Sequence, residues 1–237
     1  MPWREDELGA TKTMQEKSGS KASKKLQVYD VLRMRIVRNE LKPQQYLSEQ
    51  ELSDDLGISK TPIREALQQL ERDRLVVIIP NKGCFVSTIS LDFIREVFEI
   101  REIYECAAAR IAASLNDRSQ FEAVFQNHES FQGDDVESAR RAVLSGYQIH
   151  EIIVNSAKNG LLTEYYRHIL DHIVRIRMNF MTNFDSKRVR ETREEHRAIL
   201  QAIIDGNPDE AEKAMREHMR RSLTTIDRLV ERARGTE

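Results

Sequence analysis

Apolar positions in residues 25–89 follow a helical period at first and a strand pattern at the end. The first set, which predicts one amphipathic helix, consists of Leu26, Tyr29, Val31, Leu32, Ile36 and Val37. Ser48 is a candidate N-cap for a short helix over residues 49–56, which Gly57 ends, and a second helix follows at once. A β-rich run then begins, and a turn at residues 80–83 separates two short strands. The pattern predicts three helices followed by a β-hairpin.

Residues 90–237 contain apolar stripes of helical period only. The predicted helices run roughly over residues 90–115, 118–131, 135–156, 159–183, 186–205 and 208–233. Gly, Asn and Asp residues separate them, and Asn207 followed by Pro208 is a strong signal for the start of a helix. Helices of this length joined by short breaks predict an antiparallel bundle.

The composition agrees with long helices and limits the class of protein. Of the 237 residues only 9 are Gly and 5 are Pro, and the 40% that are hydrophobic can form a core. Residues 1–24 are polar after Trp3, so we expect a solvated tail. No apolar run approaches the ~18 residues that span a bilayer, and the N-terminus lacks a signal-peptide core. Cys84 and Cys106 cannot form a disulfide scaffold, so we expect a reducing compartment and a cytoplasmic protein. Since no apolar run is long enough to span a bilayer, we expect no membrane partner.

Charge is divided unevenly along the chain. The formal total is −2, from 37 basic and 39 acidic residues. Residues 21–90 carry 12 basic and 9 acidic side chains, a net +3, whereas residues 91–237 carry 22 and 26, a net −4. The first of these parts is therefore the one suited to a polyanion.

The second helix and the hairpin of residues 25–89 carry polar and basic side chains where DNA reading requires them. A helix that enters the major groove needs small donors and cations on its outer N-terminal face. The residues that supply them are Ser59, Lys60, Thr61 and Arg64. The hairpin tip, which suits the DNA backbone or the minor groove, consists of Asn81, Lys82 and Gly83. These features predict a winged helix-turn-helix, although an isolated motif of this kind is more often a solvated helix face.

Residues 46–86 contain a dense series of motifs in register. They include Leu47-Ser48-Glu49, Leu56-Gly57-Ile58-Ser59, Thr61-Pro62-Ile63-Arg64-Glu65-Ala66-Leu67 and Gly83-Cys84-Phe85-Val86. This run resembles the DNA-binding domain of GntR-family bacterial transcription regulators. The resemblance implies that the recognition helix contacts bases or phosphates through Lys60, Thr61 and Arg64. It also implies a backbone contact from Gln50 and a wing contact from Asn81, Lys82 and Gly83.

All six histidines lie in residues 90–237, and three of them fall on apolar stripes. These three, each on a different predicted helix, are His150, His196 and His218. Imidazole is the commonest protein ligand for metals, so three inward histidines suggest one shared ion. From spacing alone, core packing is the better explanation for each of them.

Looser motifs cover most of residues 90–225. They include Arg101-x-x-x-Glu105, Ile149-His150, Asn159, Glu195-His196 and His218. Together they resemble the FCD effector domain of the FadR subfamily of GntR regulators. The resemblance implies a divalent metal held by one Asp and three His, but Gly146 stands in the place of the Asp. We therefore expect Zn²⁺ or Ni²⁺ on three histidines, with an open position beside Gly146, and we expect Gly146→Asp to raise metal affinity.

Three further side chains are candidates for binding an effector. Arg101 lies on the apolar face of its helix, where it can form an i,i+4 ion pair with Glu105 or clamp an effector carboxylate. Tyr147 and His172 lie on inward stripes and are candidates to face the same cavity. Core packing is the alternative for both.

The patterns predict a mainly α fold, with a winged helix-turn-helix domain at residues 25–89 and an antiparallel helical bundle at residues 90–237. The resemblance implies that this bundle is of the FCD type. The predicted function is a homodimeric transcription regulator that binds a two-fold double-stranded DNA operator and responds to a small organic acid. One rival is a DNA-binding regulator whose dimerisation domain is inert. The other is a helical metalloenzyme, which the absence of H-E-x-x-H and Glu-x-x-His motifs argues against.

Overall fold

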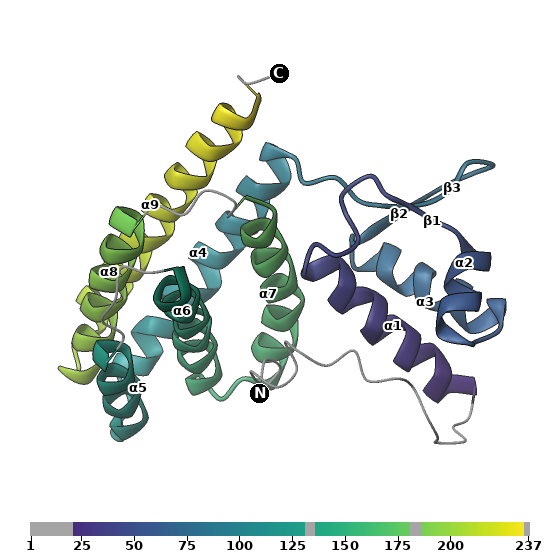
Figure 1. Ribbon diagram of the computed structural model, residues 1–237. Coiled ribbons are helices and arrows are strands. Elements are labelled where there is room, and N and C mark those ends of the chain that lie inside the picture. Colours follow the sequence, from purple (N-terminus) through teal and green to yellow (C-terminus); the bar gives the residue numbers. More distant parts are fainter. Residues whose placement is uncertain (1–20, 131–135, 181–185, 235–237) are drawn as a thin grey trace. The chain divides into compact units, whose positions relative to one another are not determined.

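The computed structural model describes residues 21–130, 136–180 and 186–234 (Figure 1). Most of the expected N-terminal tail lies outside these residues, and the first helix already begins at Lys21. No helix among the described residues has both the length and the apolar character needed to cross a membrane.

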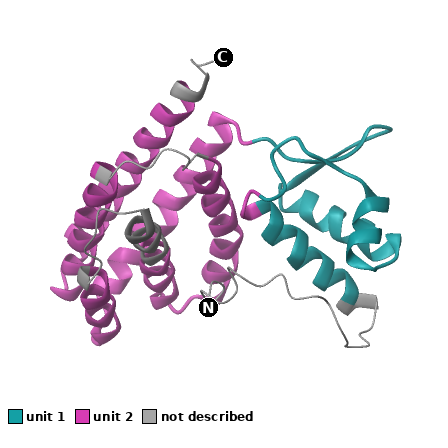
Figure 2. Ribbon diagram, in the orientation of Figure 1, with its two compact units in different colours: residues 1–36, 40–88 teal, residues 37–39, 89–237 magenta. Residues whose placement is uncertain are grey.

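The chain forms two compact units, drawn in different colours in Figure 2. Unit 1 comprises residues 1–36 and 40–88, and unit 2 comprises residues 37–39 and 89–237. The buried apolar residues divide into two clusters in the same way, one in each unit. Each unit therefore has a hydrophobic core of its own.

Unit 1 contains three helices and a small sheet. Its elements are α1 (Lys21–Val37), β1 (Tyr46–Leu47), α2 (Glu49–Leu56), α3 (Lys60–Arg72), β2 (Val76–Ile79) and β3 (Gly83–Val86). Ser48 caps α2 by accepting a hydrogen bond from the Glu51 amide at 3.3 Å, and Gly57 ends it in the left-handed conformation at φ 63°. The core side chains come from every helix, and burying each Leu or Ile stabilises the unit by roughly 1.5–3 kcal/mol.

The sheet of unit 1 is antiparallel and has the strand order β1-β3-β2. The predicted hairpin pairs Val77 with Phe85, and β1 adds a third strand by pairing Tyr46 with the same Phe85. The sequence pattern did not predict β1, because two residues are too few to show a strand period. Gly83 has φ +107°, and a Cβ atom there would lie 2.6 Å from the Tyr46 ring, so both conformation and packing require glycine.

Unit 2 consists of helices throughout its described residues. They are α4 (Leu91–Ala113), α5 (Ser119–Ser130), α6 (Val136–Ser156), α7 (Gly160–Phe180), α8 (Ser186–Ile204) and α9 (Pro208–Arg234). Ser90 caps α4 by accepting from the Phe93 amide, and Asn207 caps α9 by accepting from the Glu210 amide. The predicted fold class, mainly α with a winged helix-turn-helix and a helical bundle, is confirmed.

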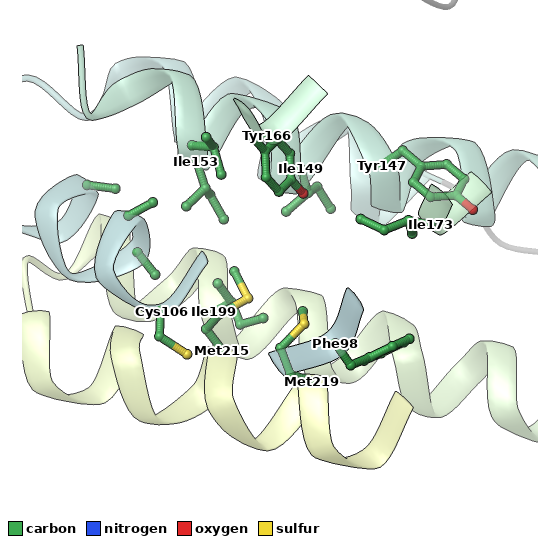
Figure 3. Packing of buried hydrophobic residues seen from close by; sticks show 14 of the residues in the cluster. Phe98, Cys106, Tyr147, Ile149, Ile153, Tyr166, Ile173, Ile199, Met215 and Met219 are labelled. Atoms are coloured by element: carbon green, nitrogen blue, oxygen red, sulfur yellow. The ribbon is translucent and has the colours of Figure 1, made fainter. Parts of the chain in front are cut away.

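The core of unit 2 lies where α4 packs against α6, α7, α8 and α9. In Figure 3, Ile149 and Ile153 of α6 and Tyr166 of α7 face Met215 and Met219 of α9 across this core. Several charged and histidine side chains are buried among these apolar groups. Because burying a charge is costly unless it is paired, they are the natural place to look for a site.

Candidate functional site

The N-terminal end of α3 presents the polar face that the sequence predicted. Ser59, Lys60, Thr61 and Arg64 are all exposed, whereas the opposite face of α3 is buried in the core of unit 1. The Ser59 hydroxyl makes no capping hydrogen bond to α3. This exposed face is available to a ligand without any loss of core packing.

Two of the predicted DNA contacts have partners within unit 1. Arg64 donates from Nε and Nη2 to the two carboxylate oxygens of Glu49, at 2.9 and 2.7 Å. Gln50 donates through its amide to the Asp54 carboxylate, with a shortest distance of 2.8 Å. An exposed ion pair is worth only ~0–1 kcal/mol, so Arg64 can exchange Glu49 for a phosphate or a base at low cost. The sequence pattern did not reveal either partner.

The wing tip, residues 81–83, forms a tight turn between β2 and β3. Asn81 adopts the left-handed conformation at φ 61°, which Asn tolerates better than most residues. The Lys82 amide closes the turn by donating to the Ile79 carbonyl at 3.0 Å. Asn81 and Lys82 are exposed, and Gly83 is half-buried against the Tyr46 ring. Unit 1 thus presents a helix end and a hairpin tip, both with basic side chains.

The three histidines of unit 2 converge, as their positions on apolar stripes predicted. His150 on α6, His196 on α8 and His218 on α9 are each at most 2% exposed. Each offers one nitrogen atom, and these atoms lie within 4.8 Å of one another. His150 Nε2 is 3.2 Å from His196 Nε2. The ligand nitrogens of a tetrahedral ion with ~2.1 Å bonds lie about 3.4 Å apart, so small side-chain adjustments would complete the set.

Two buried carboxylates lie against the Nδ1 atoms of two of these histidines. His150 Nδ1 lies 2.6 Å from Glu105 Oε2, and His218 Nδ1 lies 2.7 Å from Glu195 Oε2. Each carboxylate is also held by an arginine: Glu105 by Arg101 at 2.7 Å and Glu195 by Arg188 at 2.7 Å. Sequence reasoning placed Glu105 and Glu195 only in motifs and in a helical ion pair, because their histidine partners lie on other helices.

Burial and the neighbouring charged groups together determine the protonation states of these residues. Burial opposes ionisation of both carboxylates, but Arg101 and His150 hold the pKa of Glu105 well below its usual range. In the same way His218 and Arg188 lower the pKa of Glu195 to about 2. Burial lowers the pKa of His150 and lowers that of His218 to about 3, in each case outweighing the nearby carboxylate. At neutral pH the site therefore contains ionised carboxylates and neutral imidazoles.

His196 differs from the other two histidines. Its pKa is held well below the usual range by burial and by the neighbouring His218 and His150. Its Nδ1 atom is buried and has no hydrogen-bond partner in the part of the chain that the structure describes. A fourth imidazole, His128, lies edge-on to it with ring centroids 5.6 Å apart, and His128 Nε2 is 3.2 Å from the Arg193 carbonyl. The sequence pattern did not place His128 beside the centre.

The expected open position beside Gly146 is filled by the His196 ring. A Cβ atom on Gly146 would lie 2.7 Å from His196 Cε1 and 3.4 Å from its Nδ1. A side chain there requires the buried imidazole to shift, so the expected open position is not free in this arrangement of the described residues. The effect of Gly146→Asp on metal affinity stays a prediction. Gly146 is the residue that lets His196 approach α6.

The candidate effector residues lie in different surroundings. Arg101 is 1% exposed, and its guanidinium lies 5.0 Å from the Phe98 ring centroid. Its buried Nη1 atom has no hydrogen-bond partner within the described ranges. Its ion pair with Glu105 is the one that the i,i+4 spacing predicted. Tyr147 is buried, with the Arg177 guanidinium 5.1 Å from its ring centroid. His172 is half-buried and meets Phe93 edge-on at 5.0 Å.

Two surface grooves of unit 2 lie away from the histidines. One, of about 650 Å³, is lined at the turn between α6 and α7 by residues that include Lys158 and Arg167. The other, of about 570 Å³, lies between α4 and α9 and includes Ile103, Cys106 and Arg216. Neither groove is lined by His150, His196 or His218, which are buried in the core of unit 2.

Comparison with known families covers both units. Residues 24–86 match the model of the bacterial regulatory proteins of the gntR family, and residues 96–221, more than half of the chain, match that of the FCD domain. The chain belongs to the GntR family. Its combination of a GntR helix-turn-helix with an FCD domain is consistent with the FadR subfamily. The interpretation of this chain as a DNA-binding transcription regulator is therefore confirmed.

Several similar proteins align with most of this chain and with most of their own length. The HTH-type transcriptional repressor RspR of Escherichia coli K12 is 28% identical over 208 residues, which cover 86% of this chain and 89% of that protein. The Nta operon transcriptional regulator of Aminobacter aminovorans is 26% identical and covers 82% and 89%. Among solved structures, a GntR transcriptional regulator from Rhodococcus sp. RHA1 matches with a TM-score of 0.69 at 22% identity, covering 86% and 97%. McbR/YncC of E. coli gives 0.68 at 19% identity, with the same coverage.

Proposed function

We propose that this GntR regulator acts in the cytoplasm as a homodimer whose affinity for a two-fold DNA operator changes when a small organic acid binds to unit 2. The recognition face of α3 and the wing tip would contact DNA, and the histidine centre with Arg101 would form the effector site. The observation that carries the effector site is the convergence of three buried imidazoles beside two ionised carboxylates.

The residues of the centre fit a divalent cation such as Zn²⁺ or Ni²⁺. Three neutral imidazoles are a suitable donor set for both metals. His218 Nε2 is buried and has no hydrogen-bond partner among the described residues, which is a costly arrangement unless a ligand engages it. When bound, the ion would supply a Lewis-acid position for an anionic oxygen. Arg101, through its unpartnered Nη1 atom, supplies a second contact for an acidic effector.

A homodimer is supported by the requirements of the operator and by the surface of α4. A single winged helix makes few phosphate contacts, and two half-sites one helical turn apart need a two-fold protein. On α4, large apolar side chains remain exposed at Ile100, Ile103 and Ile111. Such side chains along one helix are typical of a surface that is covered in an assembly.

The DNA assignment is tested by substituting Arg64. An operator is first selected from random DNA, and affinity is then measured by fluorescence anisotropy at one salt concentration. We expect Arg64→Ala to weaken operator binding by ~1–3 kcal/mol if the side chain reads a base. Arg72→Ala is the matched control, because Arg72 lies at the other end of α3 and bonds to Gln69. Equal affinities of wild type and Arg64→Ala would show that α3 docks differently.

The effector assignment is tested by thermal shift on chelator-treated protein. We expect Zn²⁺ and Ni²⁺ to raise the melting temperature more than Mg²⁺ does, since nitrogen ligands favour transition metals. The metal-loaded protein is then screened with small carboxylic acids for a change in operator affinity. His218→Ala should remove the metal response. A chain that responds to neither metals nor acids is the rival regulator with an inert dimerisation domain.

A further inference from the structure

Two arginine–glutamate pairs, one on α4 and one on α8, contact the histidine centre. On α4, Arg101 holds Glu105, whose Oε2 atom lies 2.6 Å from His150 Nδ1 on α6. On α8, Arg188 holds Glu195, whose Oε2 atom lies 2.7 Å from His218 Nδ1 on α9. The Tyr166 hydroxyl also donates to Glu105 Oε1 at 3.0 Å. The same order, arginine to carboxylate to imidazole, is thus built twice from different helices.

The position of each carboxylate selects one tautomer of its histidine. An ionised carboxylate is only an acceptor, so it favours a proton on the Nδ1 atom that faces it. His218 Nδ1 forms this hydrogen bond to Glu195 Oε2, whereas His150 Nδ1 lies 2.6 Å from Glu105 Oε2 without hydrogen-bond geometry. The Nε2 atom of the same ring then carries the lone pair. In His150 this atom points to His196 Nε2 at 3.2 Å, and in His218 it is buried without a partner. Both lone pairs are therefore directed away from the carboxylates, and that of His150 towards His196.

His196 is positioned by other means. Among the described residues, no hydrogen-bond partner faces its buried Nδ1 atom. Its ring instead packs against the backbone of α6 at Gly146, where there is no room for a Cβ atom. Packing therefore sets the orientation of this third imidazole, and it leaves the tautomer of His196 free to change when a ligand arrives.

We propose that Glu105 and Glu195 are the positioning residues of the centre: they direct the Nε2 lone pairs of His150 and His218 to one divalent cation, in place of a carboxylate bound directly to it. This inference rests on the proposed metal site. A carboxylate behind a histidine fixes the orientation of the ring and makes its far nitrogen a stronger donor. The arginines in turn hold the carboxylates in place.

A structural role alone would also explain why removing either glutamate harms the protein. Glu105 is 0% exposed and is the partner of a buried guanidinium, so its loss leaves Arg101 uncompensated. The deciding measurements must therefore respond to the histidine tautomers or to the metal, and not to folding alone.

The first test uses wild-type protein without metal and needs no variant. Long-range ¹H–¹⁵N correlation spectra distinguish an imidazole protonated on Nδ1 from one protonated on Nε2. We expect His150 and His218 to carry the proton on Nδ1 at neutral pH. A proton on Nε2 of either ring would overturn the positioning role of its glutamate.

The second test measures Zn²⁺ affinity by competition with a chromophoric chelator. We expect Glu195→Gln and Glu105→Gln each to weaken Zn²⁺ binding by about 10–100-fold, with circular dichroism used to select folded protein. The matched controls are Glu194→Gln and Glu102→Gln, since these neighbouring carboxylates face Arg197 and Arg216 and not a histidine. Controls should bind Zn²⁺ like wild type.

The outcomes separate this inference from the proposed function. Zn²⁺ binding by wild type that survives both substitutions in folded protein overturns the positioning role and leaves the metal site in place. Wild-type protein that binds no Zn²⁺ overturns the metal site itself. Should Glu105→Gln not fold, Glu195→Gln decides the affinity test, because Arg188 is partly exposed and tolerates the loss of its partner better.

Discussion

The burial of His218 predicts how stability depends on pH in the metal-free protein. Its side chain is 0% exposed, and burial lowers its pKa from 6.5 to about 3 although Glu195 acts in the opposite direction. A histidine with a lower pKa in the folded chain binds its proton only on unfolding, so acid favours the unfolded state. The stability from this group is fully present above pH 6.5 and is lost as the pH falls toward 3.

The magnitude follows from the proton that the unfolded chain gains. Between pH 7 and pH 5 the loss for one such histidine is about 2 kcal/mol. It is measured by urea unfolding with circular dichroism, in the presence of a chelator, on wild type and on His218→Gln. Over this interval we expect wild type to lose about 2 kcal/mol more than His218→Gln does. His168→Gln, which removes an exposed imidazole on α7, serves as the control and should behave like wild type.

Equal losses in wild type and His218→Gln would refute the reasoning. That result would mean that His218 is protonated in the folded state, as the charged partner of Glu195, and that its Nε2 atom carries a proton. The unfolding free energies of all variants are compared at the same ionic strength, because salt screens the interactions of surface charges.

Three further predictions concern single positions. Gly146→Ala should bring no stabilisation in thermal unfolding, because overpacking against His196 costs ~1–3 kcal/mol and outweighs the ~1 kcal/mol gain in helix propensity; a clear gain would contradict the packing. Gly83→Ala should lower the free energy of unfolding of unit 1 by about 1–3 kcal/mol, from the left-handed conformation and the clash with Tyr46; an unchanged urea midpoint would disprove this. Ile103→Asp should yield monomers in light scattering at micromolar protein, whereas Leu161→Asp should not, although the two native side chains are 67% and 66% exposed; dimeric Ile103→Asp would remove α4 from the interface.

Local signals in the sequence determined most of the elements. The ends of the unit 2 helices lie within two residues of the predicted ones, except at α7, which ends at Phe180 while its predicted end at residue 183 lies outside the described residues. Ser48, Gly57 and Asn207 act at the helix ends as expected, since each works through hydrogen bonds or a conformation within one turn. The inward stripes likewise placed His150, His196 and His218 in one core. Periodicity shows which face of a helix is buried, and so the sequence alone supported the fold and the three-histidine centre.

Only the tertiary structure decided what each buried group meets. Glu105 and His150 are 45 positions apart in the sequence, and which atoms face each other depends on how α4 and α6 are rotated and translated in the packed bundle. The same holds for Arg64 and Glu49 and for the pairing of β1 with β3. Gly146 is the clearest case. In the sequence, Gly146 stands where the family resemblance implies a metal-binding Asp. In the structure, the His196 ring packs against Gly146, because close packing fills the space that a side chain would occupy.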